Sequence, residues 1–222
     1  MTDLPPRYSP LGDSAVTIRL GDVISRELSA RVFRVAEALC DAALDGVVDI
    51  VPSYGCIGVF YDPIRVKFAE LLSQLRPIVD QTRKSASGES ESMRGSVIRI
   101  PVLYDGADLG EVAARSGYSE DEVVRLHAER EYHVYVIGFV PGFAYLGELH
   151  PALVLPRRAT PRAHVPGGSV AIAEAQTGVY PFSTPGGWHL IGTTNAKMFD
   201  AAARNPALLR VGDRVVFEPV AK

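Results

Sequence analysis

The stretch VPGGSVAIAEAQTGVYP, residues 165–181, shows the pattern that decides the fold of the C-terminal half: a short apolar strand bounded by glycines and prolines. The same pattern begins near Tyr132 and ends with an apolar segment at Arg214–Pro219. Of the chain's 36 glycines and prolines, 16 fall between Gly138 and Gly192. Many short strands separated by regular turn residues predict a β-barrel or a β-sandwich.

The N-terminal half has a different pattern, in which helices and strands alternate. Alternating apolar residues predict strands at 14–20, 47–51 and 56–61. Apolar residues at three- and four-residue steps predict two helices, one at 28–43 capped by Asp22 and one at 68–79. Pro77 is expected to kink the second helix or end it early. The N-terminal half is therefore predicted to be an α+β unit.

A segment of low complexity separates the two halves. SASGESES, residues 85–92, contains one small apolar residue and no periodicity, which is typical of a flexible linker. We therefore predict an α+β sandwich domain at 1–84, a linker at 85–95 and a β-barrel domain at 96–222.

Composition excludes several classes of protein. The chain has 222 residues, 47% apolar and 22% charged, and a formal net charge of −3. It lacks the basic excess of nucleic-acid binders, so we expect no nucleic-acid partner.

We see no signal-peptide pattern and no apolar run of the roughly 20 residues that a membrane span needs, so we expect a cytoplasmic protein with no membrane partner. Cys40 and Cys56 have neither disulfide nor metal spacing, and we expect no bound metal.

Two short helices are predicted at 108–115 and 119–130, where Asp108 with Glu111 and Ser119 with Glu122 match capping boxes. A helix-turn-helix DNA reader is excluded, because residues 108–131 carry seven acidic and three basic side chains.

The window 138–192 contains the candidate binding residues. It holds two acidic residues but three arginines, and guanidinium groups present paired donors to carboxylates and phosphates. Arg157 and Arg162 are therefore predicted to bind an anion, with surface or interdomain ion pairs as the alternative. Gly168 and Ser169 either present amides and a hydroxyl to that anion or form a plain hairpin turn.

Further polar and aromatic residues could complete such a site. Gln176, Thr177 and Tyr180 offer an amide, a hydroxyl and a phenol, which either read a small polar ligand or satisfy buried backbone groups. Phe143, Trp188 and His189 are predicted to form a pocket wall or partner surface, although a lone tryptophan is often a core anchor. The aromatic stretch 139–146 is interpreted as loop packing. The sequence assigns no catalytic residue, and it contains no standard phosphate-binding or nucleophile motif.

Four strings in this order resemble one family, the 5-oxoprolinase B-subunit family, also called allophanate hydrolase subunit 1 or the sensor histidine kinase inhibitor family. They are Gly138-Phe139-x-Pro141-Gly142-Phe143-x-Tyr145-Leu146, Pro156-Arg157-x-x-x-Pro161-Arg162-x-x-Val165-Pro166-x-Gly168-Ser169-Val170, Gln176-Thr177-Gly178-Val179-Tyr180-Pro181 and Pro185-Gly186-Gly187-Trp188-x-Leu190-Ile191-Gly192-x-Thr194. The resemblance implies that the β-barrel is cyclophilin-like.

The resemblance also implies an activity and partners. It implies ATP-dependent opening of 5-oxoproline to L-glutamate together with subunits A and C, in a hetero-oligomer without which the chain is inactive. ATP with Mg²⁺ is then a co-substrate, with a site that the complex completes. This chain carries no biotin segment.

Two alternatives follow from the same resemblance. The chain could be a regulatory inhibitor that binds a sensor histidine kinase, or a carboxyltransferase-like subunit of an allophanate hydrolase and urea carboxylase system.

Overall fold

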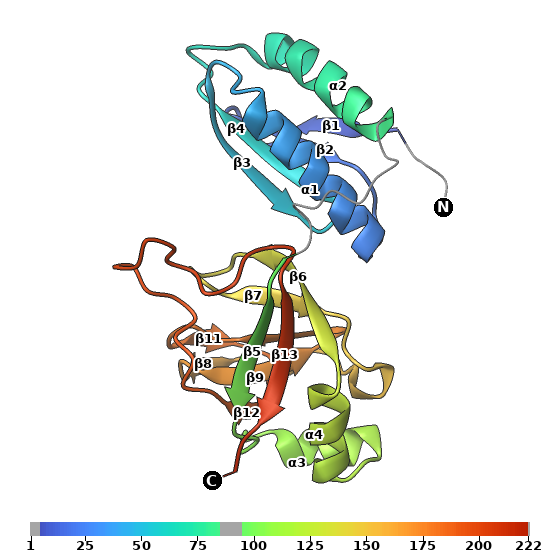
Figure 1. Cartoon of the computed structure of the whole chain (residues 1–222), viewed down its shortest axis with the longest axis vertical. Coiled ribbons are helices and arrows are strands. Elements are labelled where there is room, and N and C mark those ends of the chain that lie inside the picture. Colours follow the sequence, from blue (N-terminus) through green and yellow to red (C-terminus); the bar gives the residue numbers. More distant parts are fainter. Residues whose placement is uncertain (1–4, 85–94, 222) are drawn as a thin grey trace. The chain divides into compact units, whose positions relative to one another are not determined.

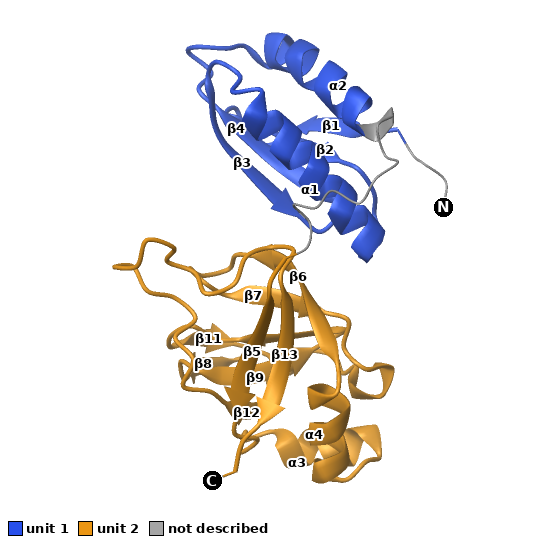
Figure 2. Cartoon of the chain, viewed as in Figure 1, with its two compact units in different colours: residues 1–94 blue, residues 95–222 orange. Residues whose placement is uncertain are grey.

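The structure is a computed structural model that describes residues 5–84 and 95–221. The chain divides into two compact units, Met1–Arg94 and Gly95–Lys222, which Figure 2 colours separately. Residues 85–94 of the predicted linker lie outside the described residues. Among the described residues, no helix is long and apolar enough to cross a membrane.

The first unit packs two helices against a four-stranded antiparallel sheet, with strand order β1-β2-β4-β3 (Figure 1). Its elements are β1 (Arg7–Pro10), β2 (Ala15–Arg19), α1 (Arg26–Asp41), β3 (Val47–Ser53), β4 (Cys56–Tyr61) and α2 (Phe68–Lys84). The inward residues of β2 and β4 pack with the apolar stripes of both helices in one core. The expected strands and helices are all present, and the edge strand β1 is an additional element.

In this unit the predicted Asp22 cap is wrong, and of the two outcomes expected at Pro77 the early end is excluded. Ser25 caps α1, because its side chain accepts a hydrogen bond from the Leu28 N–H at 3.2 Å. Asp22 instead forms ion pairs with Arg7 and Arg19. α2 continues past Pro77 to Lys84, so the expected early end does not occur.

The second unit consists of a seven-stranded sheet, two short helices and a separate two-stranded sheet, β11-β8. Its elements are β5 (Val97–Val102), α3 (Leu109–Ser116), α4 (Glu120–Ala128), β6 (Glu131–Ile137), β7 (Ala144–Gly147), η2 (Pro151–Leu153), β8 (Arg162–Val165), β9 (Ser169–Ala173), β10 (Gln176–Val179), β11 (Thr184–Gly186), β12 (His189–Thr193) and β13 (Arg214–Pro219).

The seven-stranded sheet curls into a nearly closed barrel. Its strand order is β12-β9-β10-β7-β6-β13-β5, and its two edge strands meet where Leu103 pairs with Thr193. Each of these two residues donates its N–H to the carbonyl oxygen of the other, at 2.9 and 2.7 Å. This pair satisfies backbone groups that an open edge would expose. Of the two architectures predicted from the turn pattern, the barrel is therefore the one observed.

His127 of α4 is fully buried in the barrel core and makes two side-chain hydrogen bonds. Its Nδ1 lies 2.7 Å from the Tyr104 hydroxyl, and its Nε2 lies 2.9 Å from Thr177 Oγ1. Because the Thr177 hydroxyl donates to the Ala171 carbonyl at 3.0 Å, it accepts the His127 Nε2–H. The imidazole is thus held in its neutral form, and burial lowers the pKa of His127 to about 3.

We expect this histidine to make stability depend on pH. In the unfolded chain it binds a proton below a pKa of about 6.5, whereas the folded state excludes that proton down to about pH 3. The free energy of unfolding should therefore fall by about 2 kcal/mol between pH 7 and pH 5. Urea unfolding at both pH values measures it. His127→Gln should weaken this dependence, and His164→Gln, at an exposed position, should retain it.

Candidate functional site

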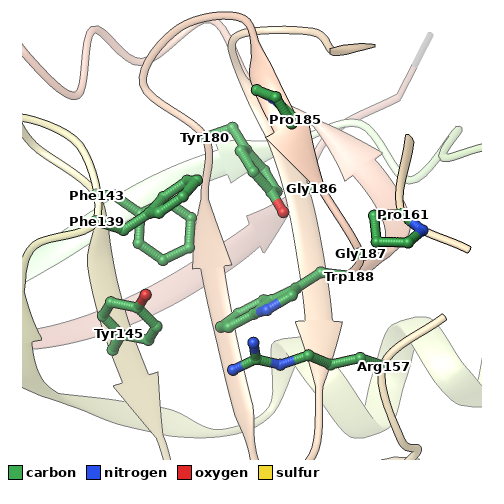
Figure 3. A pocket seen from close by; sticks show the side chains of 10 residues that line it. All are labelled: Phe139, Phe143, Tyr145, Arg157, Pro161, Tyr180, Pro185, Gly186, Gly187 and Trp188. Carbon is green, nitrogen blue, oxygen red and sulfur yellow. The ribbon is translucent and has the colours of Figure 1, made fainter. Parts of the chain in front are cut away.

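A pocket of about 240 Å³ in the second unit brings aromatic residues and one arginine together. Figure 3 shows its lining residues, Phe139, Phe143, Tyr145, Arg157, Pro161, Tyr180, Pro185, Gly186, Gly187 and Trp188. Two hollows beside α1 and β3 in the first unit have only acidic residues as their charged lining, namely Glu37, Asp41 and Asp49. The pocket of the second unit is therefore better suited to an anionic ligand.

The aromatic wall is built around Phe143, a buried residue directly before β7. Its ring makes edge-to-face contacts with four other rings, and the centroids are 4.9 Å apart for Tyr145, 5.3 Å for Tyr180, 5.5 Å for Trp188 and 5.7 Å for Phe139. Such perpendicular contacts fix ring orientations as well as bury apolar area. The wall is therefore a preformed apolar surface.

Arg157 supplies the positive charge of the pocket. Its side chain runs along the pocket beside Trp188 (Figure 3) and is 58% exposed. Its ion pair with Glu174 is long, at 3.6 Å between Nε and Oε1, and the Glu174 side chain is 62% exposed. An exposed pair of this kind contributes little energy, so the guanidinium can turn to an incoming anion at small cost.

Arg158 and Arg162 have a different environment, because both bind the buried carboxylate of Asp108. Arg158 Nη1 and Arg162 Nη2 lie 2.9 and 2.6 Å from Asp108 Oδ1, and the Leu190 N–H donates to Oδ2 at 2.7 Å. Burial acts to raise the pKa of Asp108, but these hydrogen bonds and the two positive charges together outweigh burial and lower it. Arg162 is thus held in an ion pair, but with a buried carboxylate of its own unit rather than in the surface or interdomain pair given as the alternative.

The Asp108 side chain does not cap α3, and the predicted capping box with Glu111 is wrong. Its carboxylate oxygens are used by β12 and by the two arginines instead. The other predicted capping box, Ser119 with Glu122 at the start of α4, is confirmed.

Hydrogen bonds on either side of Arg157 fix the segment that carries it. His189 donates its Nε2–H to the Pro156 carbonyl at 2.9 Å, and the Arg158 N–H donates to the Gly187 carbonyl at 2.8 Å. Pro156 is thereby bonded to the start of β12, and Arg158 is bonded to the residue that follows β11. Arg157, which lies between them, is held in place. His189 itself is fully buried.

Five of the seven predicted binding residues are not among those that line this pocket: Arg162, described above, and Gly168, Ser169, Gln176 and Thr177. The Gly168 N–H donates to the Tyr180 carbonyl at 2.7 Å and the Ser169 N–H to the Pro166 carbonyl at 3.3 Å, so both amides serve the turn. Gly168 has φ +81°, and a Cβ there would lie 2.4 Å from the Thr194 oxygen, which explains the glycine. Thr177 bonds His127 in the barrel core, and Gln176 begins β10 opposite Ala173.

The predicted residues that line the pocket are Arg157, Tyr180, Phe143 and Trp188. Outside its lining, His189 bonds the Pro156 carbonyl and Arg162 pairs with Asp108. Site residues that were not predicted from the sequence include Asp108, whose acidic side chain matched a helix cap, and Phe139 and Tyr145, which lie in the stretch interpreted as loop packing. The available signal was the two-residue spacing of Phe143 and Tyr145, which places both on one face of a strand.

A family model and two relatives of known name match this chain over most of its length. The family model "Carboxyltransferase domain, subdomain C and D" matches residues 6–209. The 5-oxoprolinase B subunit of Escherichia coli O157:H7 is 43% identical over 212 residues, which is 94% of each chain. The protein of the same name from Bacillus subtilis (strain 168) is 37% identical over 93% of this chain and 90% of its own.

A solved structure also matches this chain. The crystal structure of the protein TTHA0988 matches 94% of this chain with a TM-score of 0.81 and 42% identity. The match covers 40% of the TTHA0988 chain, so this chain spans less than half of that protein's length.

Proposed function

This chain belongs to the 5-oxoprolinase B-subunit family, and we propose that it is the B component of a complex that opens 5-oxoproline to L-glutamate with ATP. The observation that supports this proposal most is the pocket itself, in which an aromatic wall faces a single exposed arginine. 5-Oxoproline has the matching chemistry, because it is a small five-membered lactam ring with one carboxylate.

The residues of the pocket have separate roles in this proposal. Arg157 binds the substrate carboxylate through paired N–H donors. The rings of Phe143 and Trp188 pack against the lactam and exclude water. Pockets for drug-sized ligands have volumes of roughly 300–1,000 Å³. The smaller volume of about 240 Å³ suits a compact ring.

Two phenols supply neutral hydrogen-bond donors. Burial raises the pKa of Tyr145 and of Tyr180, so both hydroxyls keep their protons at neutral pH. We propose that one of them donates to the lactam carbonyl oxygen, where negative charge develops as the ring opens. A donor placed in this way stabilises the transition state more than the ground state.

The pocket is too small to hold ATP beside the ring, so we propose that ATP with Mg²⁺ binds elsewhere in the complex with subunits A and C. The described residues include no group of three His, Cys, Asp or Glu side chains that could hold a metal ion. The role proposed for this chain is to bind and orient 5-oxoproline. We further propose that the barrel is of the cyclophilin-like type and that the complex acts in the cytoplasm, where ATP is available.

Omission of the chain tests this proposal. Subunits A and C are produced with and without it, and ATP-dependent glutamate release from 5-oxoproline is measured. We expect activity only when all three are present. Full activity without this chain would show that it is not part of the enzyme.

A further inference from the structure

Phe139 combines two unfavourable features at the edge of the pocket. Its backbone has φ +71°, a conformation that glycine adopts readily but that is rare for a residue with a bulky side chain. The residue is also 59% exposed, although phenylalanine gains free energy from burial. Local strain of this kind persists only where the surrounding structure imposes it, and it is concentrated at functional sites.

The loop around Phe139 imposes this conformation. The Gly138 N–H donates to the Phe143 carbonyl at 3.0 Å, and the Phe143 N–H donates to the Val140 carbonyl at 3.1 Å. Gly142 has φ +81°, and a Cβ there would lie 2.7 Å from Phe199 Cβ. The turn is therefore tight and packed against its neighbours, and Phe139 is held in place by it.

The held ring belongs to the pocket. Phe139 is one of its lining residues, and its ring meets that of Phe143 edge to face at 5.7 Å and 82° (Figure 3). Because Phe143 covers only part of the Phe139 ring, apolar area remains open beside the pocket. A flat ligand in the pocket would cover that area.

We infer that Phe139 is a ligand-contacting residue that covers one side of the substrate ring and makes the site selective for a cyclic substrate over an open-chain one. This inference rests on the proposed function of the pocket. A planar lactam presents a flat face to the phenyl ring, whereas glutamate, the open-chain product, presents a flexible and fully charged chain. The same contact that retains the substrate therefore favours release of the product.

Three substitutions at this position and one matched control test the inference in the assembled complex with subunits A and C. Phe139→Ala and Phe139→Gly should both raise KM for 5-oxoproline about tenfold with kcat nearly unchanged, because the lost contact is made equally in ground and transition states. Inhibition by added glutamate should change far less. Phe139→Tyr, which keeps the ring, should restore KM. Phe182→Ala removes another exposed phenylalanine, outside the pocket lining, and should leave KM unchanged.

Thermal unfolding measures the backbone strain at position 139 independently of the loss of the phenyl ring. Glycine tolerates positive φ and alanine does not, so the Phe139→Gly chain should be at least as stable as the Phe139→Ala chain. At an ordinary helical or extended position glycine would be the less stable of the two. A clearly lower stability for Phe139→Gly would overturn the strain on which the inference depends.

The kinetic outcomes are distinct. Wild-type KM in both truncated variants, while the wild-type complex is active, would overturn the role of Phe139 and leave the proposed function standing. An equal rise of KM in Phe182→Ala would also overturn it, since the effect would not belong to the pocket. A wild-type complex that releases no glutamate would contradict the proposed function itself, and with it the role of Phe139.

Discussion

Replacing Asp108 with alanine is expected to lower the free energy of unfolding of the second unit by about 3–5 kcal/mol, because it leaves the partly buried Arg162 charge without its ion-pair partner. The Asp108 side chain is 4% exposed and accepts hydrogen bonds from Arg158, Arg162 and Leu190. Removing the carboxylate leaves the partly buried Arg162 guanidinium and the Leu190 N–H without this partner, whereas Arg158 keeps its ion pair with Glu111 at 2.9 Å. Urea unfolding followed by the fluorescence of Trp188, the chain's single tryptophan, measures the loss.

A matched control shows whether burial is the cause. Glu129 pairs with Arg125 at 3.0 Å on α4, and both side chains are more than half exposed. Glu129→Ala should change the free energy of unfolding by no more than about 0.5 kcal/mol. If Asp108→Ala were as mild as Glu129→Ala, the arginines would not depend on this carboxylate and the description of the cluster would be wrong.

Replacing Arg157 with alanine is expected to raise KM for 5-oxoproline about 10- to 100-fold, which is the range for losing a charge-assisted hydrogen-bonded pair. Stability and assembly should be unaffected, because the guanidinium is exposed and its ion pair with Glu174 is long. Arg157→Lys should show a smaller rise, since lysine keeps the charge but not the paired donors. Steady-state kinetics of the assembled complex, with assembly checked by size-exclusion chromatography, measure both changes.

Arg125→Ala is the matched control for this prediction, because Arg125 is an exposed, ion-paired arginine of the same unit that lies outside the pocket lining. It should leave KM at the wild-type value. An unchanged KM in Arg157→Ala would remove Arg157 from the substrate site, and the pocket would then lack a charged group for the carboxylate.

Much of the fold could be predicted from local sequence patterns. The alternation in β2 and the three- and four-residue steps in α1 place apolar side chains on one face, and burial of that face determines both elements. The Ser119 capping box could be predicted because all its partners lie within four residues. Closure of the barrel could not be predicted in this way. The Leu103 and Thr193 backbones meet only when strands that are far apart in the sequence pair.

The site could be predicted only in part, for the same reason. Arg157, Phe143 and Trp188 stand out through their residue types in a window rich in glycine and proline. No local pattern distinguishes Arg157 from Arg162, because the difference is made by Asp108, which lies 54 residues before Arg162. The helix cap predicted at Asp108 is wrong for a similar reason: the local pattern matches a cap, but two distant arginines and β12 bind its carboxylate oxygens instead.

The most direct test of the proposed site uses the single tryptophan of the chain, Trp188, which lines the pocket. The full chain is produced with 5-fluorotryptophan, combined with unlabelled subunits A and C, and titrated with 5-oxoproline while its one ¹⁹F resonance is recorded. We predict a saturable shift of that resonance, with a midpoint that rises in Arg157→Ala. A resonance that stays unchanged while the same sample releases glutamate would show that the substrate binds elsewhere.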